Sequence, residues 1–217
     1  MRILEVDLFT ADIDGTATFY EGQLQWPVLF RSPTLIQFQV GYSTLSFHLA
    51  SVPEQPFYHL AFAIPWSLVE AGAKWVATRT PLLPFSNADL VDFPNWQARA
   101  FYFADNNGNI LEGIGRKPLP GPSITAFTAD CFLGVNEVGL PEANVLERCT
   151  AWQAEYNVPF FERGPKRADF AAMGDDEGLF VVSAIGRGWL PTFRPAERHK
   201  LRVQFAQSGQ VHTLAVT

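Results

Sequence analysis

The sequence has few cysteines and histidines, and it lacks both a basic cluster and a long apolar run. Its two cysteines, Cys131 and Cys149, fall in strand-like and helical patterns, so we expect buried thiols in a reducing compartment rather than a disulfide. With a net charge of −6 and no basic cluster, nucleic acids and anionic membranes are not expected partners. No run is long enough to span a bilayer, and Glu5 and Asp7 come too early for a signal peptide. We therefore expect a soluble cytoplasmic protein.

What the sequence does contain is typical of a globular protein. Of its 217 residues, 47% are hydrophobic and 18% are charged, which is enough apolar surface for a proper core. Its 19 Phe and 6 Trp favour sandwiches, barrels or lined pockets.

The first part of the chain reads as a unit of one strand, one helix and three strands. Ile3–Phe9 alternates like a strand, Asp12 is placed to cap a helix, and Pro27 ends that helix. Three short strands are then expected near 28–31, 35–40 and 44–50.

A second unit follows the same order. We expect a strand at Tyr58–Ile64, a helix at Trp66–Thr78 and a hairpin at Ala98–Gly113, whereas the strand within 82–96 is not placed by the pattern. In the hairpin, the turn Asp105-Asn106-Asn107-Gly108 contains residues that tolerate positive φ.

A third unit repeats the first. Glu5 and the apolar face of the helix that follows it both recur 132 residues later, beginning with Glu137. Its further strands are expected near 159–163, 169–173 and 179–185. The tail adds two strands, 201–206 and 211–216, which resemble a fourth unit without its helix. Lys117–Pro122 is the clearest linker, so we predict two domains: paired units at 1–116, and the third unit with the residual strands at 123–217.

Units of this kind bury their sheets by pairing into a half-barrel whose inward strand faces line a cup. The predicted class is therefore α+β, with repeated βαβββ modules forming mixed-sheet half-barrels: two complete modules, a third, and a residual fourth. We expect units one and two to share the cup. The half-barrels close either within one chain or across a homodimer.

Four residues are predicted to face this cup from equivalent strands: Glu5, His48, His59 and Glu112. A carboxylate such as Glu112 is costly in an apolar strand unless it is paired, and two imidazoles with two carboxylates suit Zn²⁺, Ni²⁺, Mn²⁺ or Fe²⁺. Taken singly, each residue is better explained as an ordinary partly buried histidine, a surface carboxylate or a salt-bridge partner, and only the four together favour a metal site. A two-residue shift in the last strand of unit one would replace His48 with Ser46.

Two stretches carry a resemblance to a known family. Phe57–Pro65 together with Asp105–Glu112 resembles the second module of the vicinal oxygen chelate superfamily, which includes glyoxalase I, extradiol dioxygenases, and fosfomycin and bleomycin resistance proteins. Ile3–Leu8 with Phe19-Tyr20 resembles its first module. Gly174–Phe180 and Gly186–Thr192 resemble the C-terminal extension of a bacterial glyoxalase-like subgroup.

The resemblance implies that the metal ligands are Glu5, His48, His59 and Glu112. The first is usually His or Gln and the second is usually Glu in glyoxalase I, so Glu5 and His48 depart from the pattern. The His usual at the position of Glu5 in extradiol dioxygenases is absent, which weakens that assignment. In the third unit Glu137 matches Glu5, but the place matching Glu112 is assigned to Val182, so this half is not expected to hold a full site.

The expected function is that of a glyoxalase-like, metal-dependent lyase or isomerase. Its substrate would be a small molecule with vicinal oxygens, chelated by a Lewis-acid metal, with Glu5 or Glu112 as the catalytic base. Arg99, Trp96 and Phe101 are candidate substrate-binding residues, although the pattern favours an ordinary surface position for Arg99 and core positions for the two aromatics. The alternatives are a metal-free binding protein of the bleomycin-resistance type and an extradiol-type dioxygenase.

Overall fold

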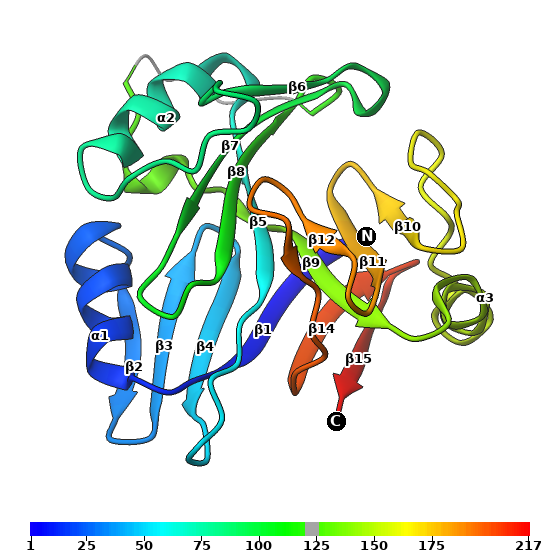
Figure 1. Cartoon of the computed structure of the whole chain (residues 1–217), viewed down its shortest axis with the longest axis horizontal. Coiled ribbons are helices and arrows are strands. Elements are labelled where there is room, and N and C mark those ends of the chain that lie inside the picture. Colours follow the sequence, from blue (N-terminus) through cyan, green and yellow to red (C-terminus); the bar gives the residue numbers. More distant parts are fainter. Residues whose placement is uncertain (120–125) are drawn as a thin grey trace.

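The computed structural model describes residues 1–119 and 126–217 and shows the repeated units as two large sheets with helices outside them (Figure 1). It confirms the predicted α+β class with βαβββ modules. Asp12 caps the first helix as expected, since its carboxylate accepts the N–H of Gly15 at 2.9 Å. The first unit comprises β1 (Arg2–Thr10), α1 (Ile13–Ala17) with a π-helical extension (Thr18–Gln23), β2 (Val28–Ser32), β3 (Leu35–Val40) and β4 (Ser43–Leu49).

The second unit supplies the strand that the sequence pattern could not place, as β6. The unit consists of β5 (His59–Ile64), a 3₁₀ turn (Trp66–Leu68), α2 (Val69–Ala77), β6 (Val91–Phe93), β7 (Ala98–Ala104) and β8 (Ile110–Arg116). A buried carboxylate holds the hairpin turn between β7 and β8. Asp105 accepts hydrogen bonds from the Tyr20 hydroxyl at 2.8 Å and the Asn109 amide at 2.7 Å, which ties the turn to the first unit.

The third unit has one named strand fewer than predicted. It consists of β9 (Gly134–Glu142), α3 (Val145–Tyr156), β10 (Phe170–Asp175) and β11 (Gly178–Ala184). Only a single bridge, Phe160 to Met173, forms where the strand at 159–163 was expected. The chain then passes through the short strands β12 (Gly188–Trp189) and β13 (Arg194–Pro195) and ends in β14 (Leu201–Gln207) and β15 (Gln210–Val216). The predicted linker Lys117–Pro122 lies partly outside the described residues.

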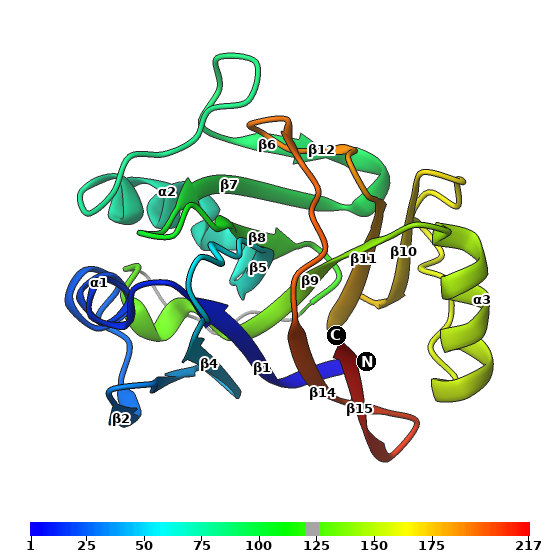
Figure 2. The same cartoon turned by 60° about the horizontal axis from the view of Figure 1, so that its bottom comes forward.

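The units pair differently from the expectation. One sheet, here called sheet A, has the order β15-β14-β1-β4-β3-β2, and the other, sheet B, has the order β10-β11-β9-β5-β8-β7-β6. Unit one therefore shares its sheet with the C-terminal strands, which lie beside β1 in Figure 2. Unit two shares sheet B with unit three, because β5 pairs antiparallel with β9.

Strand alternation in sheet B separates a core face from a cup face. Leu60 and Phe62 join the main core, where the Phe62 ring lies 4.9 Å from Trp26, whereas His59 and Ala61 point to the opposite face, as the period of two requires. Both cysteines are buried and free, as predicted. No helix within 1–119 or 126–217 has the length and apolar character needed to cross a membrane.

Candidate metal centre

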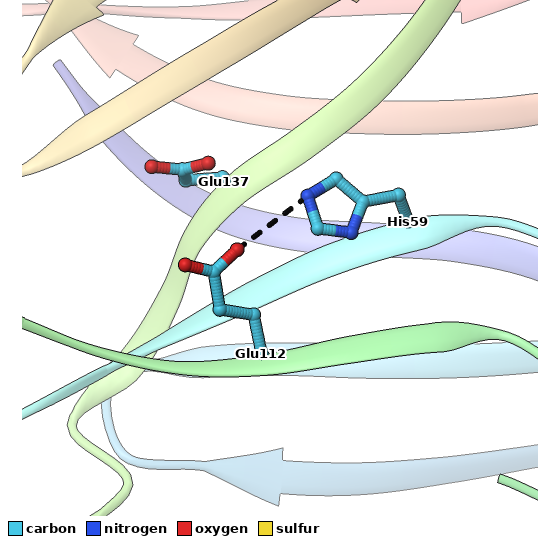
Figure 3. A group of neighbouring side chains, drawn as sticks. All are labelled: His59, Glu112 and Glu137. Atoms are coloured by element: carbon cyan, nitrogen blue, oxygen red, sulfur yellow. Dashed lines mark ion pairs between the residues drawn. The ribbon is translucent and has the colours of Figure 1, made fainter. Parts of the chain in front are cut away.

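Three buried side chains meet on the cup face of sheet B. His59 comes from β5, Glu112 from β8 and Glu137 from β9, and one ligand atom of each lies within 4.8 Å of the others. All three residues are at most 6% exposed. Figure 3 shows the imidazole pointing toward the two carboxylates from one side, with His59 Nε2 lying 3.7 Å from a Glu112 oxygen.

The strand register explains why these three side chains converge. Ala61 in the central strand β5 pairs with Glu112 on one side and with Glu137 on the other. Its methyl group leaves the space between the glutamates open, and His59 enters that space from two residues earlier on the same face. Diagonal neighbours of this kind lie within reach of long side chains.

His59 is fixed in one tautomer by the backbone. Its Nδ1 lies 3.1 Å from the carbonyl of Ile110. A carbonyl only accepts, so Nδ1 carries the hydrogen and the Nε2 lone pair faces Glu112. Burial lowers the pKa of His59 to about 4, against the opposing effect of the Ile110 contact. The imidazole is therefore neutral at pH 7, which is the form that binds metals.

Among residues 1–119 and 126–217, the two carboxylates have one buried cationic partner. Arg116, whose side chain is 1% exposed, bonds to Glu137 and donates to Asn136 at 2.8 Å. Burial raises the pKa of Glu112 well above its usual range, with the charge of Glu137 adding to the effect. Burial also raises the pKa of Glu137, while Arg116 opposes the rise. Two buried carboxylates beside one guanidinium therefore favour the uptake of a cation or a proton.

The three ligands lie in a cavity of about 190 Å³ with mostly apolar walls. Trp189, from the segment after β11, lies against His59 with ring centroids 5.0 Å apart. Gly139 makes this contact possible, because a Cβ there would lie 3.0 Å from His59 and 3.1 Å from Trp189. Tyr102, opposite Glu112 on β7, also lines the cavity, and burial raises its pKa well above 10, which keeps the hydroxyl protonated.

The structure brings only two of the four predicted ligands together. Glu5 lies in sheet A, where Arg202 of β14 pairs with it at 2.9 Å. His48 is also in sheet A, 3.9 Å from Asp7. The strand register decides between His48 and Ser46 as the counterpart of Glu112 in unit one. Glu5 pairs with Thr44 in the way that its counterpart His59 pairs with Ile110. Glu112 lies two residues after Ile110, so its counterpart is Ser46, which lies two residues after Thr44.

The predicted substrate-binding residues also have different locations. Trp96 lines the cavity. Phe101 is fully buried in the main core, on the other face of β7. Arg99 lies outside the cavity and pairs with Asp92 at 2.8 Å and Glu70 at 3.3 Å.

The 132-residue repeat matches Glu137 to Glu5 but does not place it in the site. The same repeat predicts Val182 at the place of Glu112 in unit three, which the strand register corrects. Glu137 pairs with Leu179, so the equivalent residue is Val181, which lines the cavity. The signal that was available is the apolar run around Glu137, which indicates a strand buried on both faces and therefore central in a sheet.

The donor chemistry of the three residues fits a divalent metal. One neutral imidazole and two carboxylates are suitable ligands for Zn²⁺, Mn²⁺ or Fe²⁺, whose bonds to such atoms are about 2.0–2.2 Å long. The candidate ligand atoms lie within 4.8 Å of one another, so the carboxylates would have to rotate toward a bound ion to reach such bond lengths. Three protein ligands also leave coordination positions open, as in catalytic rather than structural sites.

No protein-family model and no curated protein matches the sequence. Solved structures do match. A candidate dioxygenase from Bacillus subtilis aligns with 99% of this chain and 69% of its own, with a TM-score of 0.60 and 16% identity. A glyoxalase/bleomycin resistance protein/dioxygenase from Nocardioides covers 58% of this chain and 90% of its own, with a TM-score of 0.45 and 19% identity. Lactoylglutathione lyase from Agrobacterium tumefaciens covers 52% and 92%, with a TM-score of 0.44 and 20% identity.

Proposed function

We propose, on the premise that this chain has the fold of the vicinal oxygen chelate superfamily, that it is a metal-dependent lyase or isomerase. Its substrate is a small molecule with two neighbouring oxygens. The observation that carries the proposal is the buried convergence of His59, Glu112 and Glu137 in a cavity. When bound there, a divalent ion would act as a Lewis acid on the two substrate oxygens.

The chain's own residues have separable tasks at this site. Arg116 holds Glu137 by a buried ion pair, which fixes that carboxylate. Within the described residues, Glu112 makes no such ion pair with an arginine or lysine. It lies beside the neutral His59 and accepts a hydrogen bond from Tyr102. Glu112 is therefore the less tightly held of the two carboxylates and the one assigned to take a proton from the substrate. Trp189 and the apolar walls exclude water, which strengthens these electrostatic interactions.

The donor set favours this chemistry over oxygenase chemistry. Non-haem iron oxygenases of the facial-triad type use two histidines and one carboxylate, whereas the group here has one histidine and two carboxylates. A second candidate function is metal-free binding of a planar ligand. The aromatic rings that line the cavity, Phe93, Trp96, Phe170 and Trp189, support this alternative.

Metal content tests the proposal. Protein purified without a metal-loading tag is analysed beside His59→Ala and Glu112→Gln, with His48→Ala and Glu5→Gln as matched controls from sheet A. We expect about one equivalent of metal in the wild type and in both controls, and a loss in the two cup variants. If the wild type binds no metal even after Zn²⁺, Ni²⁺, Mn²⁺ and Fe²⁺ are supplied, the enzyme proposal fails and metal-free binding takes its place. Oxygen uptake by an Fe²⁺-loaded protein would instead indicate a dioxygenase.

A further inference from the structure

Two arginines line the same cavity as the three candidate ligands. Arg167 lies on a tight turn in which its N–H donates to the Phe170 carbonyl at 3.0 Å. Arg187 lies on the segment between β11 and β14, where its N–H donates to Ala184 at 3.0 Å and its carbonyl accepts from Ala196 at 2.8 Å. Because hydrogen bonds hold the backbone at both positions, the Cα atoms from which the two arginine side chains extend are fixed beside the cavity.

The two guanidinium groups share one acidic and one aromatic neighbour. The Nε atoms of Arg167 and Arg187 lie 3.2 Å and 3.4 Å from the carboxylate of Asp169. The Arg187 guanidinium carbon lies 4.4 Å from the centre of the Phe170 ring, and that of Arg167 lies 5.9 Å away. Asp169 therefore contacts both groups through their Nε atoms. Nη1 of Arg187 also donates to the Gly188 carbonyl at 3.4 Å. Within residues 1–119 and 126–217 the Nη2 atom of each arginine has no hydrogen-bond partner, which leaves it able to donate to a ligand.

The charge at this point favours an anion. Two arginines and Asp169 sum to one positive charge, which matches a single carboxylate. Guanidinium groups bind carboxylates through parallel N–H donors and are more weakly hydrated than ammonium groups. The other acidic groups that line the cavity, Glu112 and Glu137, are the candidate metal ligands, and a divalent ion would offset their charge.

The walls around the cavity indicate the body of the ligand. Aromatic and apolar side chains dominate them, including Phe93, Trp96, Trp189 and Leu190. Such walls favour a flat apolar body, and a cavity of about 190 Å³ limits it to a small molecule.

We infer that the substrate is a small planar molecule with a carboxylate, which Arg187 and Arg167 bind while its two neighbouring oxygens face His59, Glu112 and Glu137. This inference rests on the proposed function. It adds the substrate class and identifies Arg187, the less exposed of the two arginines at 29% against 55%, as the main specificity-determining residue.

Matched chelating probes test the inference on Zn²⁺-loaded protein. Calorimetry compares 3,4-dihydroxybenzoate with 4-methylcatechol, which keeps the two neighbouring hydroxyls but replaces the carboxylate with a methyl group, and with 3,4-dihydroxybenzylamine, which reverses the charge. We expect the carboxylate probe to bind about tenfold more tightly than the methyl probe, because its hydrogen bonds are charge-assisted, and we expect the amine to bind most weakly.

Substitution of the arginines should remove this preference selectively. Arg187→Ala should bring the carboxylate and methyl probes to equal affinity without changing zinc content, and Arg187→Lys should retain part of the preference. Arg148→Ala is the matched control, since Arg148 is an exposed arginine outside the cavity with an acidic and an aromatic neighbour. If Arg187→Ala does not fold, the more exposed Arg167→Ala replaces it, with a smaller loss of preference expected.

The outcomes separate this inference from the proposed function. Equal binding of all three probes by wild-type protein that contains zinc would overturn the carboxylate inference and leave the metal site intact. A preference that survives in both alanine variants would also overturn it. A protein that takes up no zinc would instead fail the proposed function itself.

Discussion

Sheets A and B both contain a glutamate at the same position in the first strand of a unit, but the two glutamates have different neighbours. Each begins a unit with a glutamate at the same place, Glu5 in β1 and Glu137 in β9. In sheet A, Arg202 crosses from β14 and pairs with both Glu5 and Asp7. In sheet B, the neighbouring strand β5 instead places the small Ala61 opposite Glu137, so His59 and Glu112 reach the carboxylate.

This difference indicates that the neighbouring strand, and not the sequence of the repeated unit, determines whether the first-strand glutamate joins a group of candidate ligands. On the partner strand of sheet A, one long cationic side chain pairs with both nearby carboxylates. On that of sheet B, a small residue leaves space between two buried carboxylates, and the buried ion pair that Arg116 makes there reaches Glu137 and not Glu112. Three pairs of matched substitutions, one member in each sheet, test this comparison.

The largest effect is expected from removing the arginine of each sheet. Arg116→Ala leaves two buried carboxylates without a counter-charge and should lower the free energy of unfolding of the metal-free protein by about 3–5 kcal/mol. Arg202→Ala removes the ion pairs to Glu5 and Asp7 from an arginine whose side chain is 38% exposed and should cost about 1 kcal/mol or less. Urea denaturation measures both. Added Zn²⁺ should rescue part of the Arg116→Ala loss, and equal costs in the two sheets would contradict the comparison.

A smaller effect with a distinct pH dependence is expected at Glu112. Because burial raises the pKa of Glu112 above its unfolded value of 4.5, its contribution to stability is fully present below pH 4.5 and is lost as the pH rises through the folded pKa. Glu112→Gln should therefore match the wild type near pH 4.5 and become more stable than the metal-free wild type by about 1–3 kcal/mol as the pH rises.

The control for this prediction is Glu5→Gln, which removes a partly exposed ion pair in sheet A and should cost less than about 1 kcal/mol at neutral pH. Thermal unfolding from pH 4.5 to 8.5 follows both variants. A Glu112→Gln protein that loses stability relative to the wild type as the pH rises would show that this carboxylate is favourably paired instead.

The smallest effect is expected from adding a fourth donor to the cup. Val181 is the counterpart of Glu112 in unit three, is 3% exposed and lines the cavity. Val181→His should tighten zinc binding about tenfold and should weaken chelating probes by occupying an open coordination position. Ser46→His makes the corresponding change in sheet A and should create no zinc binding. Competition with a chromogenic chelator measures both affinities.

The sequence is sufficient to predict the local units and one pair of the clustered residues. Alternation and turn chemistry placed β5 and the β7–β8 hairpin, and with them His59 and Glu112. The neighbour of each unit was not predictable in this way, because strand pairing between units is decided by packing across the whole chain. The sequence therefore identifies Glu137 as a repeat of Glu5 but does not place it in the candidate site. It places Glu5 and His48 there instead.

The buried ion pair between Arg116 and Glu137 is also not predictable from the local sequence pattern. Each residue alone reads as an ordinary charged residue in a strand. Only the pairing of β5 with β9 brings the end of β8, where Arg116 lies, close to Glu137. Strand alternation predicts which face a side chain takes, but it does not predict which chain segment lies across from that face.

Anomalous diffraction from crystals grown with Zn²⁺ is the most direct test of the claim that the cup of sheet B, and not that of sheet A, binds the metal. We expect one strong anomalous peak about 2.1 Å from His59 Nε2, with oxygens of Glu112 and Glu137 at similar distances from it. A peak beside Glu5 and His48, with none between the three residues of sheet B, would contradict it.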